Sequence, residues 1–310
     1  MQILRTPDDR FNDLLDFPYK PNYVDYAYGG DSLRVHYVDE GPVDADVTGQ
    51  ELKIIPLDAE VTWLCLHGQP TWSYLYRKMI PIFSEAGHRV IAPDFIGFGR
   101  SDKLQDEALY TFDFHREMLL FLLQRLELRN IRLVCQDWGG ILGLTLPISE
   151  PDRFSALLVM NTMLATGDIP LSKGFLAWRD FVRTKPNLNI SSLMRRSVDL
   201  LSHEESIAYD APFPDVTYKA GVRRFPELVP DNPDAPGALL SREARTWWET
   251  RWQGQSAMVI GMQDVVLGPK VMNKLWSSIQ NCPPPIEISD AGHFVQEWGE
   301  PIARMAVESF

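Results

Sequence analysis

The sequence has few cysteines, no long apolar run and no recognisable leader. Its three cysteines, Cys65, Cys135 and Cys282, are an odd number without the regular spacing of a disulfide framework. No apolar stretch is long enough to cross a bilayer. The first residues also lack the apolar segment of a signal peptide. Together these absences predict a soluble cytoplasmic protein that folds without disulfides.

Basic residues are also in short supply. The chain has 30 Lys and Arg against 42 Asp and Glu, which gives a formal net charge of -12. A nucleic-acid-binding surface requires a basic patch, and anionic lipids likewise attract basic segments. We therefore expect no nucleic-acid partner and no membrane partner. A monomer is the expectation, and the sequence itself does not determine the oligomeric state.

What the sequence does contain is an alternation of short strand-like runs and longer helical patterns. Strands are predicted at 33–38, 61–66, 89–92, 131–135 and 156–160, and helices from 72 or 73 to 84, at 112–126 and at 139–149. Residues 41–60 are polar with Gly and Pro, and are predicted to hold a hairpin and loops. This alternation predicts an α/β fold with a mostly parallel sheet and helices on both faces.

The alternation stops near residue 165 and resumes near residue 247. Residues 165–246 are rich in aromatic, proline and polar residues, with helical fragments and no convincing strand. Strands are then predicted at 257–260 and 286–288, and helices at 270–279 and 302–310. We therefore expect a core domain made of residues 1–164 and 247–310, interrupted by a helical domain of residues 165–246.

Chemically suggestive residues follow three of the predicted strands. Asp137 follows the strand 131–135, Asp264 follows the strand 257–260, and His293 follows the strand 286–288. The carboxyl ends of strands in an open α/β sheet are where sites form. The chain order of nucleophile, acid and histidine is that of α/β hydrolases. The joint placement predicts a catalytic triad, with Asp137 as nucleophile, Asp264 as acid and His293 as general base.

Each of these residues has an ordinary structural interpretation when taken alone. Asp137 stands before a helix and could be its N-cap, and Asp264 could cap a helix or solvate a loop. His293 alone is typical of a surface histidine. The turn around Asp137 also departs from the usual G-x-S-x-G elbow, since Cys135 replaces the first glycine and Asp137 replaces the serine.

A further motif, residues 67–72, follows the predicted strand 61–66. A turn there can aim the backbone N–H of Gln69 toward Asp137, and the N–H of Trp138 lies directly after the nucleophile. Together these two donors would form an oxyanion hole. The alternative is a Gly-Pro turn with an incidental histidine.

These motifs resemble those of the haloalkane dehalogenases, in the branch that holds halide between two tryptophans. The resemblance lies in HGQPTW (67–72), APDFIGFG (92–99), QDWGG (136–140), GMQD (261–264) and DAGHF (290–294). It implies an α/β-hydrolase core with a helical cap over a dry cavity, and no cofactor or metal. It further implies Trp138 and Trp178 as halide donors and Phe175 as a pocket residue. Trp178 could instead be a packing residue of the cap.

The implied reaction explains an aspartate in the elbow. A carboxylate can displace halide from a short haloalkane and carry the alkyl group as an ester, which water cleaves to a primary alcohol. Other branches of the family place Asn at position 69 as a halide donor, so the role of the Gln69 side chain stays open. Some branches also place the triad acid where Asn161 stands here. An amide cannot serve as that acid, which favours Asp264.

Three rival functions remain open from the sequence. An epoxide hydrolase shares the triad but needs two cap tyrosines, for which Tyr209 and Tyr218 are available. A fluoroacetate-type dehalogenase needs paired arginines, and the chain has such pairs at 195–196 and 223–224. A non-catalytic binding protein on the same fold would be expected to have lost a triad member.

Overall fold

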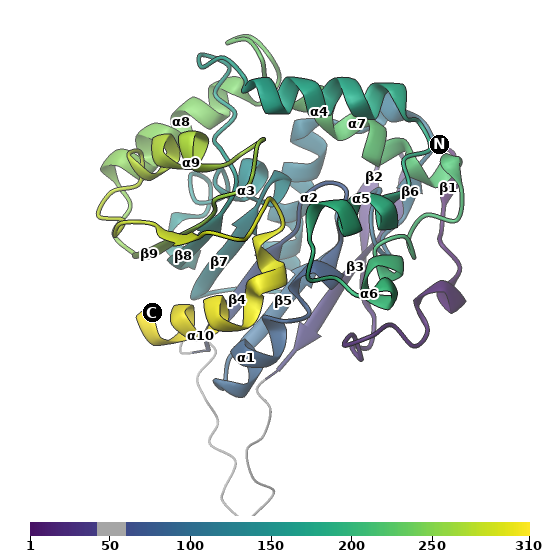
Figure 1. The fold of residues 1–310 in the computed structure, drawn as a ribbon, viewed down its shortest axis with the longest axis horizontal. Coiled ribbons are helices and arrows are strands. Elements are labelled where there is room, and N and C mark those ends of the chain that lie inside the picture. The colour runs from purple at the N-terminus through teal and green to yellow at the C-terminus, as the bar shows by residue number, and fades with distance from the viewer. Residues whose placement is uncertain (42–59) are drawn as a thin grey trace, which may run out of the picture.

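An eight-stranded mixed sheet forms the centre of the computed structural model, which describes residues 1–41 and 60–310 (Figure 1). The strand order is β10-β9-β8-β7-β4-β5-β3-β2, and the six strands from β10 to β5 run parallel to their neighbours. β3 is antiparallel to both β5 and β2. The mostly parallel α/β sheet is therefore confirmed. The predicted hairpin and loops fall largely on residues 42–59, outside the described residues.

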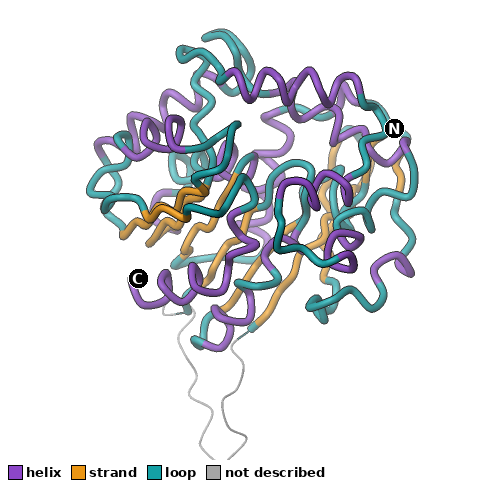
Figure 2. The backbone as a smooth tube through the Cα atoms, in the orientation of Figure 1, coloured by secondary structure: helices purple, strands orange, loops and turns teal. Residues whose placement is uncertain are grey.

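Strands and helices largely alternate along the chain as the sequence predicts. Figure 2 shows the strands gathered at the centre of the molecule with helices around them. The strands are β1 (Ile3–Leu4), β2 (Asn22–Tyr28), β3 (Asp31–Glu40), β4 (Thr62–Leu66), β5 (Arg89–Pro93), β6 (Lys103–Leu104), β7 (Ile131–Gln136), β8 (Phe154–Met160), β9 (Gln255–Gly261) and β10 (Ile286–Ile288). The α-helices are α1 (Ile80–Glu85), α2 (Phe112–Arg125), α3 (Trp138–Gly143), α4 (Lys173–Thr184), α5 (Ile190–Ser197), α6 (His203–Ala208), α7 (Ala220–Leu228), α8 (Ala238–Thr250), α9 (Pro269–Trp276) and α10 (Gly299–Ser309). Short 3-10 helices include η2 (Ser73–Tyr76) and η6 (Val295–Trp298).

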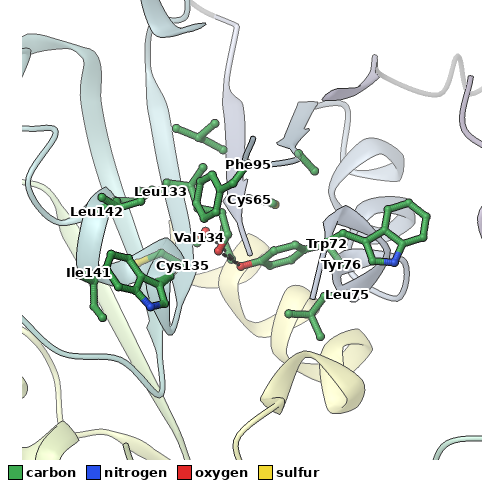
Figure 3. Packing of buried hydrophobic residues seen from close by; sticks show 14 of the residues in the cluster. Cys65, Trp72, Leu75, Tyr76, Phe95, Leu133, Val134, Cys135, Ile141 and Leu142 are labelled. Atoms are coloured by element: carbon green, nitrogen blue, oxygen red, sulfur yellow. Dashed lines mark hydrogen bonds between the residues drawn. The ribbon is translucent and has the colours of Figure 1, made fainter. Parts of the chain in front are cut away.

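Helices cover both faces of the sheet. In Figure 1, α1 and α10 lie in front of the strands, while α2 and α3 lie behind them. Strands covered on both sides cannot alternate apolar and polar residues, which is why β4 is buried along its whole length. Figure 3 shows the packing beneath β4 and β7, where the Tyr76 hydroxyl donates to the carbonyl of Leu66 at 2.7 Å. This core holds the carboxyl ends of the central strands in place.

Two predicted helices are shorter than the sequence pattern indicated. The predicted helix from 72 or 73 to 84 is divided into η2 and α1, and Pro81 lies in the first turn of α1. The predicted helix 139–149 ends at Gly143. Pro147 has no N–H to donate to the carbonyl of Gly143, four residues earlier, so the helical ladder cannot continue there.

The edge strand β2 was not predicted, although the strand 33–38 was, and it corresponds to β3. β2 pairs with β3 across the Gly29-Gly30 turn, in which both glycines have positive φ (59° and 85°). A two-residue glycine turn between strands is a hairpin signal, and β2 alternates buried Val24 and Tyr26 with more exposed neighbours. The short strands β1 and β6, which pair with each other, were also not predicted.

Five α-helices, α4 to α8, lie between β8 and β9, and residues 165–246 contain no strand. We call this stretch between the two strands the insertion. The predicted domain boundary at residue 246 falls inside α8, which contacts the core through Trp248, whose indole N–H donates to the carbonyl of Leu144 at 2.7 Å. Among the described helices, none combines the length and the apolar character needed to cross a membrane.

Candidate active site

The turn between β7 and α3 presents Asp137 at the carboxyl end of the sheet. Asp137 has φ 49° and ψ -125°, a conformation that few residues with a side chain adopt. The turn also brings α3 very close to β4, because a Cβ on Gly139 would overlap the carbonyl oxygen of Leu66. A strained strand–turn–helix of this kind exposes the residue at its tip, as a nucleophile elbow does.

The carboxylate of Asp137 is held by the motif of residues 67–72. Its Oδ1 accepts a hydrogen bond from the backbone N–H of Gln69 at 2.8 Å. Gly68 lies so close that a Cβ there would overlap the same carboxylate, so glycine is required at this position. The main-chain carbonyl of Asp137 accepts from the Thr162 hydroxyl at 2.7 Å. One donor of the predicted oxyanion hole is thus already directed at the predicted nucleophile.

His293 lies between the two predicted triad aspartates. Its Nε2 is 3.5 Å from Asp137 Oδ2, and its Nδ1 is 2.8 Å from Asp264 Oδ2. Burial lowers the pKa of His293, but the charges and hydrogen bonds of the two carboxylates outweigh it and raise the pKa to about 10. The two neighbouring carboxylates therefore favour the protonated form of the imidazole.

Asp264 is almost fully buried, and both of its oxygens are bonded. Oδ1 accepts from the backbone N–H groups of Val266 at 2.7 Å and Leu267 at 3.1 Å. Oδ2 accepts from the Asn161 amide at 2.9 Å and faces His293. Burial raises the pKa of Asp264, but His293 and these donors outweigh burial and lower it overall. The site therefore favours an ionised acid next to His293.

Two residues of this network were missed as partners of the triad. Asn161 was assigned only as a residue that cannot be the acid, yet its amide bonds Asp264 and the carbonyl of Gly261. Gln136 is fully buried, with its amide nitrogen 2.9 Å from His293 Nε2 and 3.0 Å from the His293 carbonyl. Gln136 directly precedes Asp137 in the elbow motif, and this position could have indicated that Gln136 lies near the triad.

The side chain of Gln69 points toward the insertion. Its amide nitrogen donates to the carbonyl of Val222, in α7, at 2.8 Å. The sequence left the role of this side chain open. In the structure it connects the motif of residues 67–72 to a helix of the insertion.

The two predicted halide donors have different surroundings. Trp138 is 2% exposed, and Phe225 of α7, which sequence reasoning missed, packs edge-on against it at 4.8 Å. Trp178 is half-buried on α4 and stacks on Phe181. Within residues 1–41 and 60–310, neither indole N–H has a hydrogen-bond partner, and no bond or ring contact joins Trp178 to the triad.

Phe175 is buried at the start of α4, next to a cavity of about 640 Å³. The cavity lies between the first turn of α4 and the loop that follows β9, and Leu171, Val266 and Asp264 also line it. The nucleophile, Trp138 and His293 do not line this cavity. Phe175 is therefore a cavity residue on the side of the triad acid, and its contact with substrate stays a prediction.

The arrangement brings the predicted nucleophile, base and acid into contact and directs a backbone donor at the predicted nucleophile. In the described part of the chain, no group of three or more His, Cys, Asp or Glu side chains is placed to hold a metal ion. The geometry suits transfer of a carbon group to Asp137, followed by hydrolysis of the resulting ester.

Comparisons with known proteins agree on the family. The sequence model of the α/β hydrolase fold family matches residues 63–300. A haloalkane dehalogenase of Psychrobacter cryohalolentis is 43% identical over 314 residues, covering 99% of this chain and 98% of that protein. One from Mycolicibacterium paratuberculosis is 39% identical, covering 96% of this chain and 94% of the other.

Solved structures give the same result. Haloalkane dehalogenase DpaA from Paraglaciecola agarilytica NO2, described as tetrameric, has a TM-score of 0.92 and 48% sequence identity. The match covers 100% of this chain and 99% of that one. The shared fold, the elbow with an aspartate and these identities together show that the chain belongs to the haloalkane dehalogenase family of the α/β hydrolase fold.

Proposed function

We propose that this chain hydrolyses the carbon–halogen bond of short haloalkanes through an alkyl ester on Asp137, giving a primary alcohol and halide. The observation that carries the proposal is an aspartate at the tip of the elbow, with His293 Nε2 3.5 Å from its free oxygen. A serine at this position would form an ether that water could not cleave, whereas an aspartyl ester is cleavable.

In the first step, the carboxylate of Asp137 attacks the carbon that bears the halogen. The new carbon–oxygen bond forms as the carbon–halogen bond breaks, and the electron pair of that bond leaves with the halide. An indole N–H can donate but not accept, which suits a halide ion. Trp138 and Trp178 are proposed to supply these donors, because their indole N–H groups form no hydrogen bond with the described residues.

The second step begins when the ester has removed the charge of Asp137. Asp264 and, to a smaller extent, the charge of Asp137 raise the pKa of His293, so forming the ester lowers this pKa and favours the neutral imidazole. His293 can then take a proton from water, which attacks the ester carbonyl carbon. Gln69 and Trp138 N–H groups stabilise the oxyanion, and Asp264 stabilises the imidazolium. The alcohol leaves with the proton from His293.

The side chains that the rival functions need give them less support. Tyr209 is fully buried and its hydroxyl bonds Glu297, which argues against a role in protonating an epoxide. Arg223 is engaged by Glu107 at 2.5 Å, and the arginines at 195 and 196 are exposed on α5. A non-catalytic role is not favoured either, because all three triad side chains are present and in contact.

The proposed partners are a small apolar halogenated substrate and a halide ion, without a cofactor. We propose that the insertion covers the site as a cap and that the protein works in the cytoplasm, where its three unpaired cysteines are compatible with a reducing environment. A monomer is the proposed state, and a tetramer like that described for DpaA is the alternative. Light scattering coupled to size exclusion distinguishes the two.

The trapped ester is the direct test. His293→Gln removes the base, so 1-bromobutane should leave a butyl adduct that is seen by intact mass and located on Asp137 by peptide mapping. Asp137→Asn in the same background should give no adduct within minutes, before an asparagine could deamidate. Absence of the adduct in His293→Gln, with halide released by the wild type, would contradict the ester mechanism. Turnover of 1,2-epoxybutane without halide release would favour the epoxide hydrolase.

A further inference from the structure

The helix α7 carries a proline in its interior. Pro226 lies near the end of α7 and is buried together with Val222 and Phe225. In an α-helix, each N–H donates to the carbonyl four residues earlier. Proline has no N–H, so residue 226 cannot supply the helical donor for the carbonyl of Val222. A buried carbonyl that loses its helical donor requires another one.

The side chain of Gln69 supplies that donor. Its Nε2 lies 2.8 Å from the Val222 carbonyl, and Gln69 is only 4% exposed. The backbone N–H of the same residue donates to Asp137 Oδ1 at 2.8 Å. Gln69 therefore connects α7 at one end to the predicted nucleophile at the other.

The same turn of α7 also contacts the side chain of Trp138, whose backbone N–H is the second predicted donor of the oxyanion hole. Phe225, directly before the proline, packs edge-on against the ring of Trp138 at 4.8 Å. Val222 and Phe225 are three residues apart, so they lie on one face of the helix. One face of α7 thus contacts both Gln69 and Trp138.

We propose that Pro226 and the side chain of Gln69 are positioning residues for hydrolysis of the alkyl ester. Pro226 frees the Val222 carbonyl, this carbonyl fixes the Gln69 side chain, and the fixed side chain holds the Gln69 N–H at the oxyanion. This inference rests on the proposed ester mechanism and extends it to residues of the insertion.

Loss of the contact between Gln69 and Val222 should affect the second step, which is hydrolysis of the ester. In ester formation, Asp137 loses its negative charge, so a donor bound to that carboxylate gives no advantage in the transition state. In ester hydrolysis, charge develops on the carbonyl oxygen, and a well-placed N–H stabilises it. A displaced Gln69 N–H should therefore slow hydrolysis of the ester and leave its formation nearly unchanged.

Two single variants and their combination test this contact. Gln69→Met removes the donor and keeps the length of the side chain, while Pro226→Ala gives Val222 a helical donor that competes with Gln69. Rapid-quench single turnovers with 1-bromobutane measure ester formation and ester hydrolysis separately. We expect each variant to slow hydrolysis by about tenfold, with formation changed by less than about twofold. The double variant should be no slower than the slower single variant, since both remove one contact.

Controls separate this role from a general loss of structure. Pro236→Ala changes an exposed proline of the same insertion and should leave both rate constants unchanged. Thermal unfolding identifies any variant that does not fold, and if Pro226→Ala fails, Gln69→Met decides the question alone. Bromide affinity by calorimetry should stay within about twofold in Gln69→Met, because the donor's proposed partner is a carbonyl and not the halide.

Three results would overturn the inference. They are unchanged ester hydrolysis in folded Gln69→Met, effects that multiply in the double variant, and a loss of bromide affinity in Gln69→Met without slower hydrolysis. None of these results would contradict the formation of an ester on Asp137. Absence of any ester in His293→Gln would instead contradict the proposed function.

Discussion

The two sides of the site are prepared in different ways. On the acid side, Asp264 has hydrogen-bond donors on both oxygens and is nearly inaccessible to solvent. On the proposed halide side, the indole N–H groups of Trp138 and Trp178 have no partner within the described chain. A permanent buried charge needs permanent donors, whereas donors for an ion that arrives and leaves must be free beforehand. The predictions below test this difference between the two sides.

The largest effect is expected on the acid side. Asp264→Asn removes the charge that stabilises the imidazolium, so ester hydrolysis should fall on the order of a thousandfold to ten-thousandfold. Single turnovers with 1-bromobutane would then show ester that forms and persists. Asp290→Asn is the matched control, since Asp290 lies in the motif that contains His293 but is exposed, and it accepts a hydrogen bond from the indole of Trp298. Comparable losses in both variants would exclude Asp264 as the specific partner of His293.

An intermediate effect is expected on the halide side. A hydrogen bond to a charged group contributes about 1.5–3 kcal/mol, so Trp178→Phe should weaken bromide binding by at least about tenfold. Calorimetry measures this without relying on tryptophan fluorescence. Trp247→Phe is the control, because Trp247 packs edge-on against Trp248 in the core side of α8 and should not contact halide. Equal bromide affinities in the wild type and in Trp178→Phe would show that Trp178 does not bind halide.

The charge of Asp137 should be visible in the pH dependence. Its loss on ester formation lowers the pKa of His293 from about 10, and only the neutral imidazole can accept a proton from water. Ester hydrolysis should therefore rise about tenfold per pH unit and level off at an apparent pKa well below that of the free protein. A single-turnover pH profile gives the apparent pKa of ester hydrolysis, and an NMR titration gives the pKa of His293 in the free protein. Equal values would contradict a role for the Asp137 charge.

A smaller effect is expected from Gln136. An amide nitrogen only donates, so its contact with His293 Nε2 favours the neutral imidazole and opposes protonation. Gln136→Leu should raise the apparent pKa of ester hydrolysis by less than about one unit and slow the step a few-fold at neutral pH. Gln124→Leu, which changes an exposed glutamine of α2, is the control. An unchanged pH profile in Gln136→Leu would leave the residue with a packing role.

The sequence predicts the core side of the site better than the insertion side. The strands before Asp137 and Asp264 are apolar runs, and the triad follows from chain order at strand ends, which are local signals. The contact between Gln69 and Val222 joins residues 153 positions apart, and no local pattern encodes it. The predicted helix ends were wrong for a local reason. Pro147 has no N–H, so α3 ends before the apolar pattern does.

The most direct measurement is one turnover of a bromoalkane in heavy-oxygen water, followed by peptide mass spectrometry. If the alkyl group is carried on Asp137 and water attacks the ester carbonyl, one oxygen of the Asp137 carboxylate should become labelled. The alcohol of that first turnover should then carry ordinary oxygen from the protein. Label in the alcohol and none in Asp137 would mean that water attacks the substrate directly, which would contradict the ester mechanism.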